Sequence, residues 1–322
     1  MADNPSTELR VKKRLFSGIQ PSGTLHIGNY FGVLKQWVEM SQDFDCVFCL
    51  VDYHALTTVK DPEALRRNTI GGVKDLLAIG IDPSASILFA QSSVSEHTEL
   101  AWIFECLVTV PFLQQAHAYK DKVAKGLEAN AGLFNYPMLM AADILLYDTQ
   151  VVPVGQDQRQ HVEYAREAAA KFNTAFGKTF VEPEEFIKPE VAIVPGVDGQ
   201  KMSKSYSNTI PLFGTRDEIT KAVMSIVTDS SGERPEHVYA IHKLFKTETE
   251  LTMIYQSNKG NYKALKEALV DDIEAFVAPM RERRASITDE EVKKILKDGG
   301  EKAKAIASAK MKDVRQKIGV TL

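Results

Sequence analysis

Residues 14–29 read RLFSGIQPSGTLHIGN, and this stretch decides the fold. Its first six residues are typical of a short apolar strand, and the next four are typical of a turn. From Gly28 to about Ser41, apolar residues recur at helical spacing. A helix that begins directly after such a turn offers unpaired backbone N–H groups and the positive end of its dipole. The stretch therefore predicts a phosphate site at this turn, with His26 and Asn29 on one face of the helix.

A second segment, KMSKS at residues 201–205, lies in a polar stretch flanked by glycines, which is typical of a loop. Lys201 and Lys204 supply two positive charges, and Ser203 and Ser205 supply hydroxyl groups. Such a loop can close over a triphosphate and stabilise the charge on a departing pyrophosphate. Alone, the two lysines would fit an ordinary solvated basic loop better than a nucleotide site. Together with the first segment, they indicate a nucleotide site.

Strands and helices alternate between the two segments. A helix introduced by Asp61-Pro62, an N-cap followed by a first-turn proline, is one example. Alternation of this kind predicts an α/β fold, a Rossmann-like, doubly wound parallel sheet with helices on both faces. Ligands of such sheets bind beyond the carboxyl ends of the strands, where His26, residues 52–54 and residues 155–158 fall. Besides the first strand, which begins at residue 14, further strands are expected at residues 46–51, 87–90 and 151–154.

The chain changes character past about Gly214, where strand-like runs disappear and Lys, Glu, Ala and Leu dominate. This composition predicts a helical bundle. We therefore expect a polar tail at residues 1–13, a catalytic domain at residues 14–212 and a helical domain at residues 213–322. Basic side chains that could contact phosphates in the helical domain are Arg281, Arg283, Arg284, Lys293, Lys294 and Lys297.

Composition limits the classes of protein to consider. The 322 residues are 44% hydrophobic and 25% charged, enough for a full-sized core, and the net charge of −4 argues against a strongly basic nucleic-acid coat. Three cysteines indicate a reducing compartment. Cys46 and Cys49 would face opposite ways on an apolar strand, so a zinc or redox pair is not expected. With no apolar run of 18 residues and no leader, we expect a cytoplasmic protein without membrane contact.

The two segments resemble the HIGH and KMSKS signatures of class I aminoacyl-tRNA synthetases. Within that class, residues 17–23, 136–147 and 152–158 resemble the bacterial-type tryptophanyl-tRNA synthetases. The chain departs from the first signature at Asn29, which replaces a histidine and cannot be protonated near neutral pH. The resemblance implies activation of L-tryptophan with ATP, release of pyrophosphate and transfer to tRNA(Trp). It also implies Mg²⁺ carried with ATP, an anticodon-binding role for the helical domain and a symmetric homodimer.

By resemblance, two groups of residues serve the nucleotide. Those that act in catalysis would be Asn29, Lys122, Lys201, Ser203 and Lys204, with Lys122 reaching the pyrophosphate from across the cleft. Those that bind ATP would be Gln20, Ser22, Gly23, His26, Gly28, Asn29, Gly155, Gln156, Asp157, Lys201, Met202, Ser203, Lys204 and Ser205.

The amino-acid pocket depends on Asp143, which interrupts an apolar segment. A carboxylate there is either buried with a hydrogen-bond donor or exposed on a helix surface, and periodicity leaves both open. By resemblance, it accepts the indole N–H of tryptophan, and no dedicated metal site is expected. The other expected tryptophan-binding residues are Phe16, Gly18, Gln20, Val51, His54, Tyr136, Met140, Ile144, Val152, Val154 and Gln158.

Three alternatives remain at this stage. A tyrosyl-tRNA synthetase carries the same two signatures and would activate tyrosine instead. A nucleotidylyltransferase with a related first signature would lack the helical tail and the lysine loop. A non-catalytic tRNA- or nucleotide-binding relative would bind without amino-acid activation, although Asp143 and the residues 201–205 argue against it.

Overall fold

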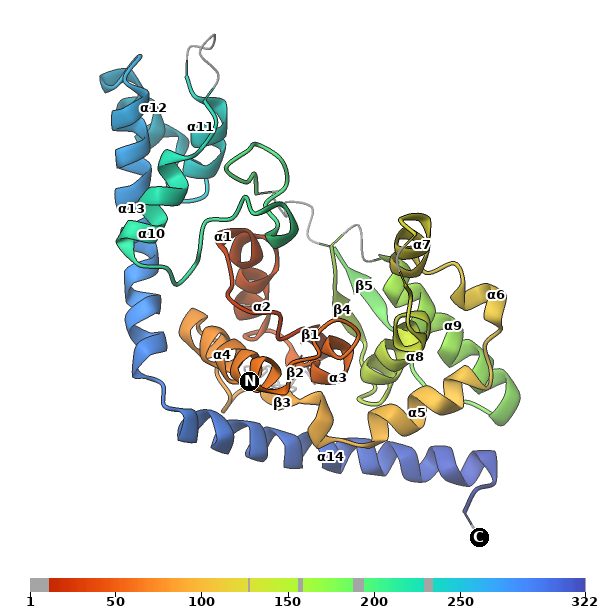
Figure 1. Cartoon of the computed structure of the whole chain (residues 1–322). Helices are drawn as coiled ribbons and strands as arrows, with labels where there is room; N and C mark the ends of the chain where they lie inside the picture. Colours follow the sequence, from red (N-terminus) through yellow and green to blue (C-terminus); the bar gives the residue numbers. More distant parts are fainter. Residues whose placement is uncertain (1–11, 127, 156–158, 188–193, 229–233, 322) are drawn as a thin grey trace, which may run out of the picture.

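The computed structural model describes residues 12–126, 128–155, 159–187, 194–228 and 234–321 (Figure 1). Its centre is a five-stranded sheet in the order β3-β2-β1-β4-β5, with every neighbouring pair parallel. This confirms the predicted α/β architecture. The fifth strand was not predicted, because a three-residue segment with a single apolar residue gives no periodic signal. The strands are β1 (Arg14–Ile19), β2 (Asp45–Leu50), β3 (Ile87–Ala90), β4 (Val151–Pro153) and β5 (Glu184–Phe186).

Helices cover both faces of this sheet. The helix α4 begins as predicted, because Asp61 accepts a hydrogen bond from the backbone N–H of Glu63 at 2.9 Å and Pro62 occupies the first turn. The helix α8 begins at Ala131, because the side chain of Asn130 accepts from the backbone N–H of Leu133 at 2.8 Å and so caps it. The helices are α3 (Asp52–Ala55), α4 (Pro62–Ile79), the 3₁₀ turn η2 (Gln91–Ser93), α5 (Glu96–Glu105), α6 (Val110–Leu113), α7 (His117–Ala124), α8 (Ala131–Leu145) and α9 (Arg159–Phe176).

The helix expected after the first turn is divided into α1 (Ile27–Asn29), a π-helical turn η1 (Tyr30–Leu34) and α2 (Lys35–Met40). Such turns within a helix often lie at functional sites. The rings of Tyr30 and Phe31 both pack on Phe276 of a distant helix, with centroids 5.3 and 5.6 Å away. The segment that carries the first signature is thereby joined to the C-terminal helices.

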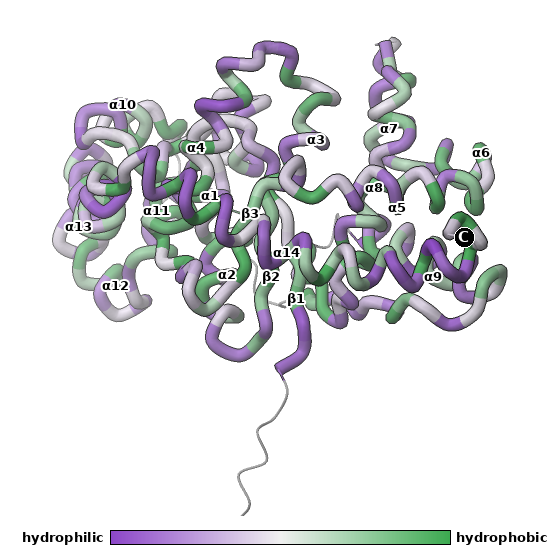
Figure 2. Tube along the Cα trace, turned by 90° about the horizontal axis from the view of Figure 1, so that it is seen from below, coloured by the Kyte–Doolittle hydropathy of each residue, from purple (hydrophilic) through white to green (hydrophobic). Residues whose placement is uncertain are grey.

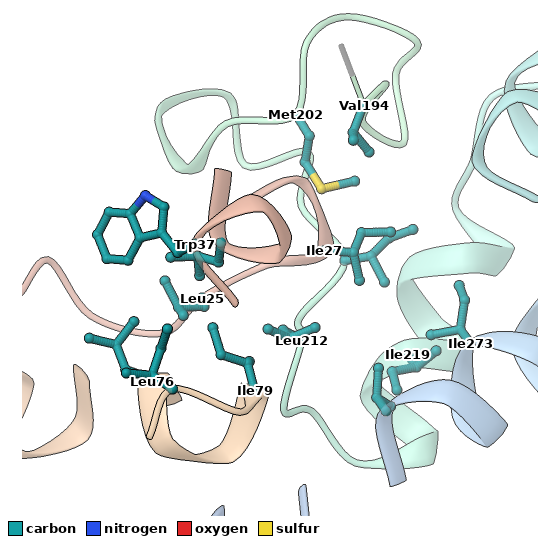
Figure 3. Packing of buried hydrophobic residues seen from close by; sticks show 14 of the residues in the cluster. Leu25, Ile27, Trp37, Leu76, Ile79, Val194, Met202, Leu212, Ile219 and Ile273 are labelled. Atoms are coloured by element: carbon teal, nitrogen blue, oxygen red, sulfur yellow. The ribbon is translucent and has the colours of Figure 1, made fainter. Parts of the chain in front are cut away.

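Two hydrophobic cores hold the molecule together. β2 and β3 are hydrophobic along most of their length (Figure 2), as expected for strands covered on both faces. One core lies between the sheet and α5, α8 and α9. The other joins Leu25, Ile27 and Trp37 to α4 and continues to Ile219 and Ile273 of the C-terminal helices (Figure 3).

The C-terminal helices do not form one bundle. α10 to α13 stand together beside the sheet, whereas α14 runs along the other end of the molecule against β3 and α5 (Figure 1). α14 covers the edge strand β3 at very short range. A β-carbon on Gly299 would lie only 1.9 Å from the carbonyl oxygen of Leu88, so a glycine is needed at this position. The expected bundle thus ends before α14. The helices are α10 (Arg216–Met224), α11 (Glu236–His242), α12 (Glu248–Ser257), α13 (Tyr262–Ser286) and α14 (Asp289–Ile318).

Three arginines named as possible phosphate contacts have hydrogen-bond partners within the fold. Arg281 donates to the carbonyl oxygen of Gly214 at 2.7 Å and pairs with Glu274. Arg283 donates to the carbonyl oxygen of Ala78 at 3.3 Å, and Arg284 forms an ion pair with buried Asp75 of α4. Arg283 and Arg284 thereby join α13 to α4, whereas Arg281 stays within the helical domain; a phosphate contact by any of the three remains a prediction. On α14, Lys293, Lys294 and Lys297 are exposed and pair with acidic neighbours on their own helix.

Candidate active site

The first signature closes on itself as a helix cap. The Nδ1 atom of His26 accepts from the backbone N–H of Asn29 at 3.3 Å, and Oδ1 of Asn29 accepts from the backbone N–H of His26 at 3.1 Å. This reciprocal pair satisfies two backbone donors at the helix start. Asn29 performs this role without a charge.

His26 is neutral at physiological pH. Burial, reinforced by the charge of Lys204, lowers the pKa of His26 from 6.5 to about 4. Because Nδ1 accepts from Asn29, the proton of the neutral ring resides on Nε2. The side chain therefore presents an N–H donor without adding charge next to Lys204.

The second signature lies directly over the first. Lys204 Nζ donates to the carbonyl oxygens of Ser22 at 3.1 Å and Gly23 at 3.2 Å, residues that lie more than 180 positions earlier in the chain. Burial lowers the pKa of Lys204, and Asp75 partly offsets this effect. A β-carbon on Gly28 would lie 3.2 Å from the β-carbon of Met202, so the glycine permits this close approach. The two segments thus form one structure.

The remaining loop residues divide into an anchor and a short turn. Met202 is buried in the core with Ile27 and Val194 (Figure 3), so its side chain anchors the loop and its expected ATP contact would have to come from its backbone. Ser203 accepts from the backbone N–H of Ser205 at 3.3 Å and so caps the 3₁₀ turn η4 (Lys204–Tyr206). Lys201 and Ser205 are exposed on either side of this anchored segment.

Lys122 lies on α7, which projects from the body of the molecule and is largely hydrophilic toward its tip (Figure 2). It is not among the residues that line the central cavity. The end of α7 nevertheless faces the second signature. The pKa of Lys125 is raised, chiefly by its hydrogen bond to Asp121 and more weakly by Tyr206 of the loop.

A cavity of about 380 Å³ opens where the strand order reverses, between the ends of β1 and β4. This is the position at which parallel sheets bind their ligands. Its walls combine apolar side chains with a few polar ones, as is typical of small-molecule sites. The cavity brings together these expected residues: Phe16, Gly18, Gln20, Asn29, Val51, His54, Tyr136, Met140, Asp143, Ile144, Val152, Val154 and Gly155. Gln156, Asp157 and Gln158 lie outside the described residues.

Asp143 is buried at the wall of this cavity, with 1% of its surface exposed. This settles the choice left open by its sequence. Burial alone would raise the pKa of the carboxyl group, but hydrogen bonds from His54 and His97 outweigh it and hold the pKa well below its usual range. Asp143 is therefore an ionised acceptor within the protein interior.

Two partners of Asp143 were missed by sequence reasoning. Gln91 Nε2 donates to Oδ1 at 2.7 Å, and His97 Nδ1 lies 2.6 Å from the same oxygen. Both come from the end of β3 and the start of α5, far from Asp143 in sequence. His161 was missed as well, and its Nε2 lies 3.1 Å from the hydroxyl of Tyr136 at the cavity wall. Nothing local in the sequence marks these residues, because their partners come from other elements.

Other features bear on cofactors and location. Cys46, Cys49 and Cys106 are free thiols, and burial raises the pKa of Cys46 to about 12. Within the part of the chain that the structure describes, no cluster of three metal-ligating side chains is found. None of the described helices combines the length and apolar character that a membrane crossing requires.

Comparison with known proteins gives a consistent result. The family pattern for class I tRNA synthetases (W and Y) matches residues 8–308. A tryptophan--tRNA ligase of Fusobacterium nucleatum is 45% identical over 319 residues, covering 96% of this chain and 98% of that protein. One from Rhodopirellula baltica is 44% identical, covering 95% and 99%.

A similar solved structure is the tryptophanyl-tRNA synthetase of Campylobacter jejuni, complexed with ADP and tryptophan. It has a TM-score of 0.90 at 42% identity and covers 95% of this chain and 99% of its own. A tyrosyl-tRNA synthetase of Archaeoglobus fulgidus, complexed with tyrosine, has a TM-score of 0.65 at 20% identity and covers 86% and 91%. At that identity the likeness concerns the fold alone.

Proposed function

The chain belongs to the class I tRNA synthetases of the W and Y family, and we propose that it works as a tryptophan--tRNA ligase. The tryptophan carboxylate attacks the α-phosphorus of ATP, which gives tryptophanyl-adenylate and pyrophosphate. A hydroxyl of the terminal adenosine of tRNA(Trp) then attacks the adenylate and releases AMP. No side chain needs to act as nucleophile, so catalysis consists of positioning and charge stabilisation.

The observation that carries the proposal is the ionised Asp143 in a largely apolar cavity. An indole ring fills such a space and offers one N–H donor to the carboxylate. A phenylalanine side chain would leave the remaining acceptor position of that carboxylate unfilled, and sites built to hydrogen-bond a substrate N–H reject analogues that lack it by roughly 10⁴–10⁵. Phe16, Met140 and Val152 then serve as walls, and Tyr136 and Gln20 serve the backbone groups of the amino acid.

The nucleotide occupies the region between the two signatures. The neutral His26 and the amide of Asn29 offer donors to phosphate, and the start of α1 contributes its dipole. Lys204 transfers its hydrogen bonds from the carbonyl groups of Ser22 and Gly23 to pyrophosphate as charge develops. Mg²⁺ enters with ATP and is held mainly by phosphate oxygens and water.

Amino-acid-dependent ATP–pyrophosphate exchange with a panel of amino acids tests the proposal. We expect exchange with tryptophan and at most trace exchange with tyrosine and phenylalanine. Exchange with tyrosine alone would identify a tyrosyl-tRNA synthetase. Binding of tryptophan or tRNA without any exchange would identify a non-catalytic relative.

A homodimer is the expected assembly, and α5 and α6 offer its surface. Trp102 is 67% exposed and Val110 is 59% exposed, although both are apolar. Exposed apolar patches of this kind mark interaction sites. Trp102→Glu should shift the mass measured by light scattering from dimer to monomer, whereas Met253→Glu on α12, equally exposed, should not. A monomeric parent protein would contradict the assignment.

Recognition of tRNA falls to α10–α13, which stand together beside the sheet (Figure 1). Arg281, Arg283 and Arg284 of α13 already have partners within the fold, so the other exposed basic residues of these helices are the first candidates for phosphate contacts. The three free thiols fit a reducing cytoplasm.

A further inference from the structure

Behind the cavity, Asp143 belongs to a hydrogen-bonded chain that continues through His97 to Tyr147. We propose that His97, held by Tyr147, is a positioning residue for tryptophan selection, which fixes Asp143 so that Oδ2 is the atom that receives the indole N–H. The proposal rests on the function proposed above. It extends that function by naming the acceptor atom and the residues that aim it.

The acceptor atom follows from counting donors. Oδ1 of Asp143 receives two, Nε2 of Gln91 at 2.7 Å and Nδ1 of His97 at 2.6 Å. Oδ2 receives one, Nε2 of His54 at 2.9 Å. An ionised carboxylate accepts about four hydrogen bonds, two on each oxygen. Oδ1 is therefore filled, and Oδ2 keeps one acceptor position. Because Asp143 and its Oδ2 partner His54 both line the cavity, we assign this open position to the ligand.

The orientation of His97 is set by its second nitrogen. His97 is fully buried, and its Nε2 lies 2.8 Å from the hydroxyl of Tyr147. The ionised carboxylate of Asp143 can only accept, so Nδ1 of His97 carries the proton of the neutral imidazole and donates to Oδ1. Nε2 is then the acceptor, and the hydroxyl of Tyr147 donates to it. Tyr147 thus stabilises the tautomer that holds the carboxylate.

The same tyrosine supports the cavity wall. Its ring stacks on Phe16, with centroids 5.7 Å apart and planes inclined by 6°, and Phe16 lines the cavity. Phe89 packs against both His97 and Tyr147, with centroids 5.9 and 5.7 Å away. The wall that would contact the indole ring and the oxygen that would accept its N–H are therefore supported by one buried group.

The test compares tryptophan with 3-(benzothiophen-3-yl)alanine, in which sulfur replaces the indole N–H. For His97→Leu we expect kcat/KM in ATP–pyrophosphate exchange to fall about 10²-fold for tryptophan, because a hydrogen bond to a buried charge is lost. The value for the analogue should stay within twofold. His97→Asn, whose amide can replace the Nδ1 donor, should recover most of the preference, and Tyr147→Phe should lose about tenfold. Tyr164→Phe, another buried tyrosine, serves as the control and should lose none.

An equal loss for both substrates in His97→Leu and in Tyr147→Phe would overturn the proposal, because a purely structural role lowers both. If His97→Leu fails to fold, Tyr147→Phe decides alone, since it removes a single oxygen. A parent protein that activates tyrosine but not tryptophan would instead refute the proposed function. A parent protein that prefers tryptophan over the analogue, with the preference unchanged in the variants, would refute only the role of His97.

Discussion

In the site as proposed, the amino-acid half and the nucleotide half are built on different principles. In the amino-acid half, the polar group that matters is buried and its carboxylate already has three donors before any ligand is bound. In the nucleotide half, Lys204 lies on an exposed loop and uses backbone carbonyl groups as partners. The first arrangement favours selection, because a fixed acceptor penalises the wrong ligand. The second favours catalysis, because its charge can exchange partners as the reaction proceeds.

The elements that pack behind the two halves of the site also differ. The amino-acid half depends on residues of β3, η2 and α5. α14 packs against these elements: its Gly299 contacts Leu88 of β3, and its Arg315 forms an ion pair with Glu99 of α5. The nucleotide half depends on backbone pairing between the turn and the loop, with Ile27 N–H donating to the Ile210 carbonyl at 3.0 Å. The position of Asp143 thus depends on packing across the whole domain, whereas the position of the loop at residues 201–205 depends on a few backbone hydrogen bonds to the segment around Ile27.

The largest effect is expected from Asp143→Ala. The substitution removes the acceptor and leaves the donors of His54 and His97 unpaired in the interior, so kcat/KM for tryptophan in exchange should fall by about 10³-fold or more. Val123→Ala on exposed α7 is the control and should change little. Retained activity with unchanged specificity would show that the amino-acid half does not depend on this carboxylate.

A smaller but still large effect is expected from Lys204→Ala. Loss of one charge that acts on the departing pyrophosphate should lower kcat of exchange by about 10²–10³. The KM for tryptophan should stay within about threefold, because the lysine contacts the nucleotide half only. Lys263→Ala on α13, at an exposed position, should leave both constants unchanged. A rise in the KM for tryptophan without a fall in kcat would show that Lys204 serves amino-acid binding rather than catalysis, and would contradict the separation of the two halves.

Gly299→Ala tests whether distant packing supports the amino-acid half. Its β-carbon would meet the Leu88 backbone, so we expect the free energy of unfolding to fall by about 1–3 kcal/mol and the tryptophan KM to rise. Gly71→Ala in α4 is the matched control, because its nearest neighbour would lie 3.6 Å away and alanine favours a helix. Chemical denaturation and exchange kinetics measure both effects. Equal stabilities for the two variants would show that α14 does not need the close approach.

The smallest effect concerns pH and His26. Its pKa falls from 6.5 to about 4 on folding, so between these values the unfolded state binds more protons than the folded state. Stability should therefore rise with pH across this window and be lost as pH falls from 6.5 toward 4. His26→Asn keeps a capping side chain but cannot titrate, and its denaturation curve should depend less on pH in this window. The same pH slope in both proteins would refute the assignment.

The sequence was informative where function depends on local pattern. The strand, turn and helix of residues 14–29, the Asp61 cap and the loop at residues 201–205 all lie where they were expected. Asp143 could be named but not oriented, because apolar residues flank it on all sides. His97, Gln91 and Gly299 could not be found, since each matters through a partner that only the tertiary fold supplies. The arginines of α13 show the same limit, because the sequence could name them as candidate phosphate contacts but could not show that the fold pairs them with Glu274 and Asp75.

Tryptophan binding in the absence of ATP, measured by isothermal titration calorimetry, tests the division most directly. We expect the parent protein and Lys204→Ala to bind tryptophan with affinities within about threefold of each other, since a preformed amino-acid half needs no nucleotide contact. Asp143→Ala should show no measurable binding at the same concentrations. Loss of tryptophan binding in Lys204→Ala, or normal binding in Asp143→Ala, would contradict a site in which one half selects and the other reacts.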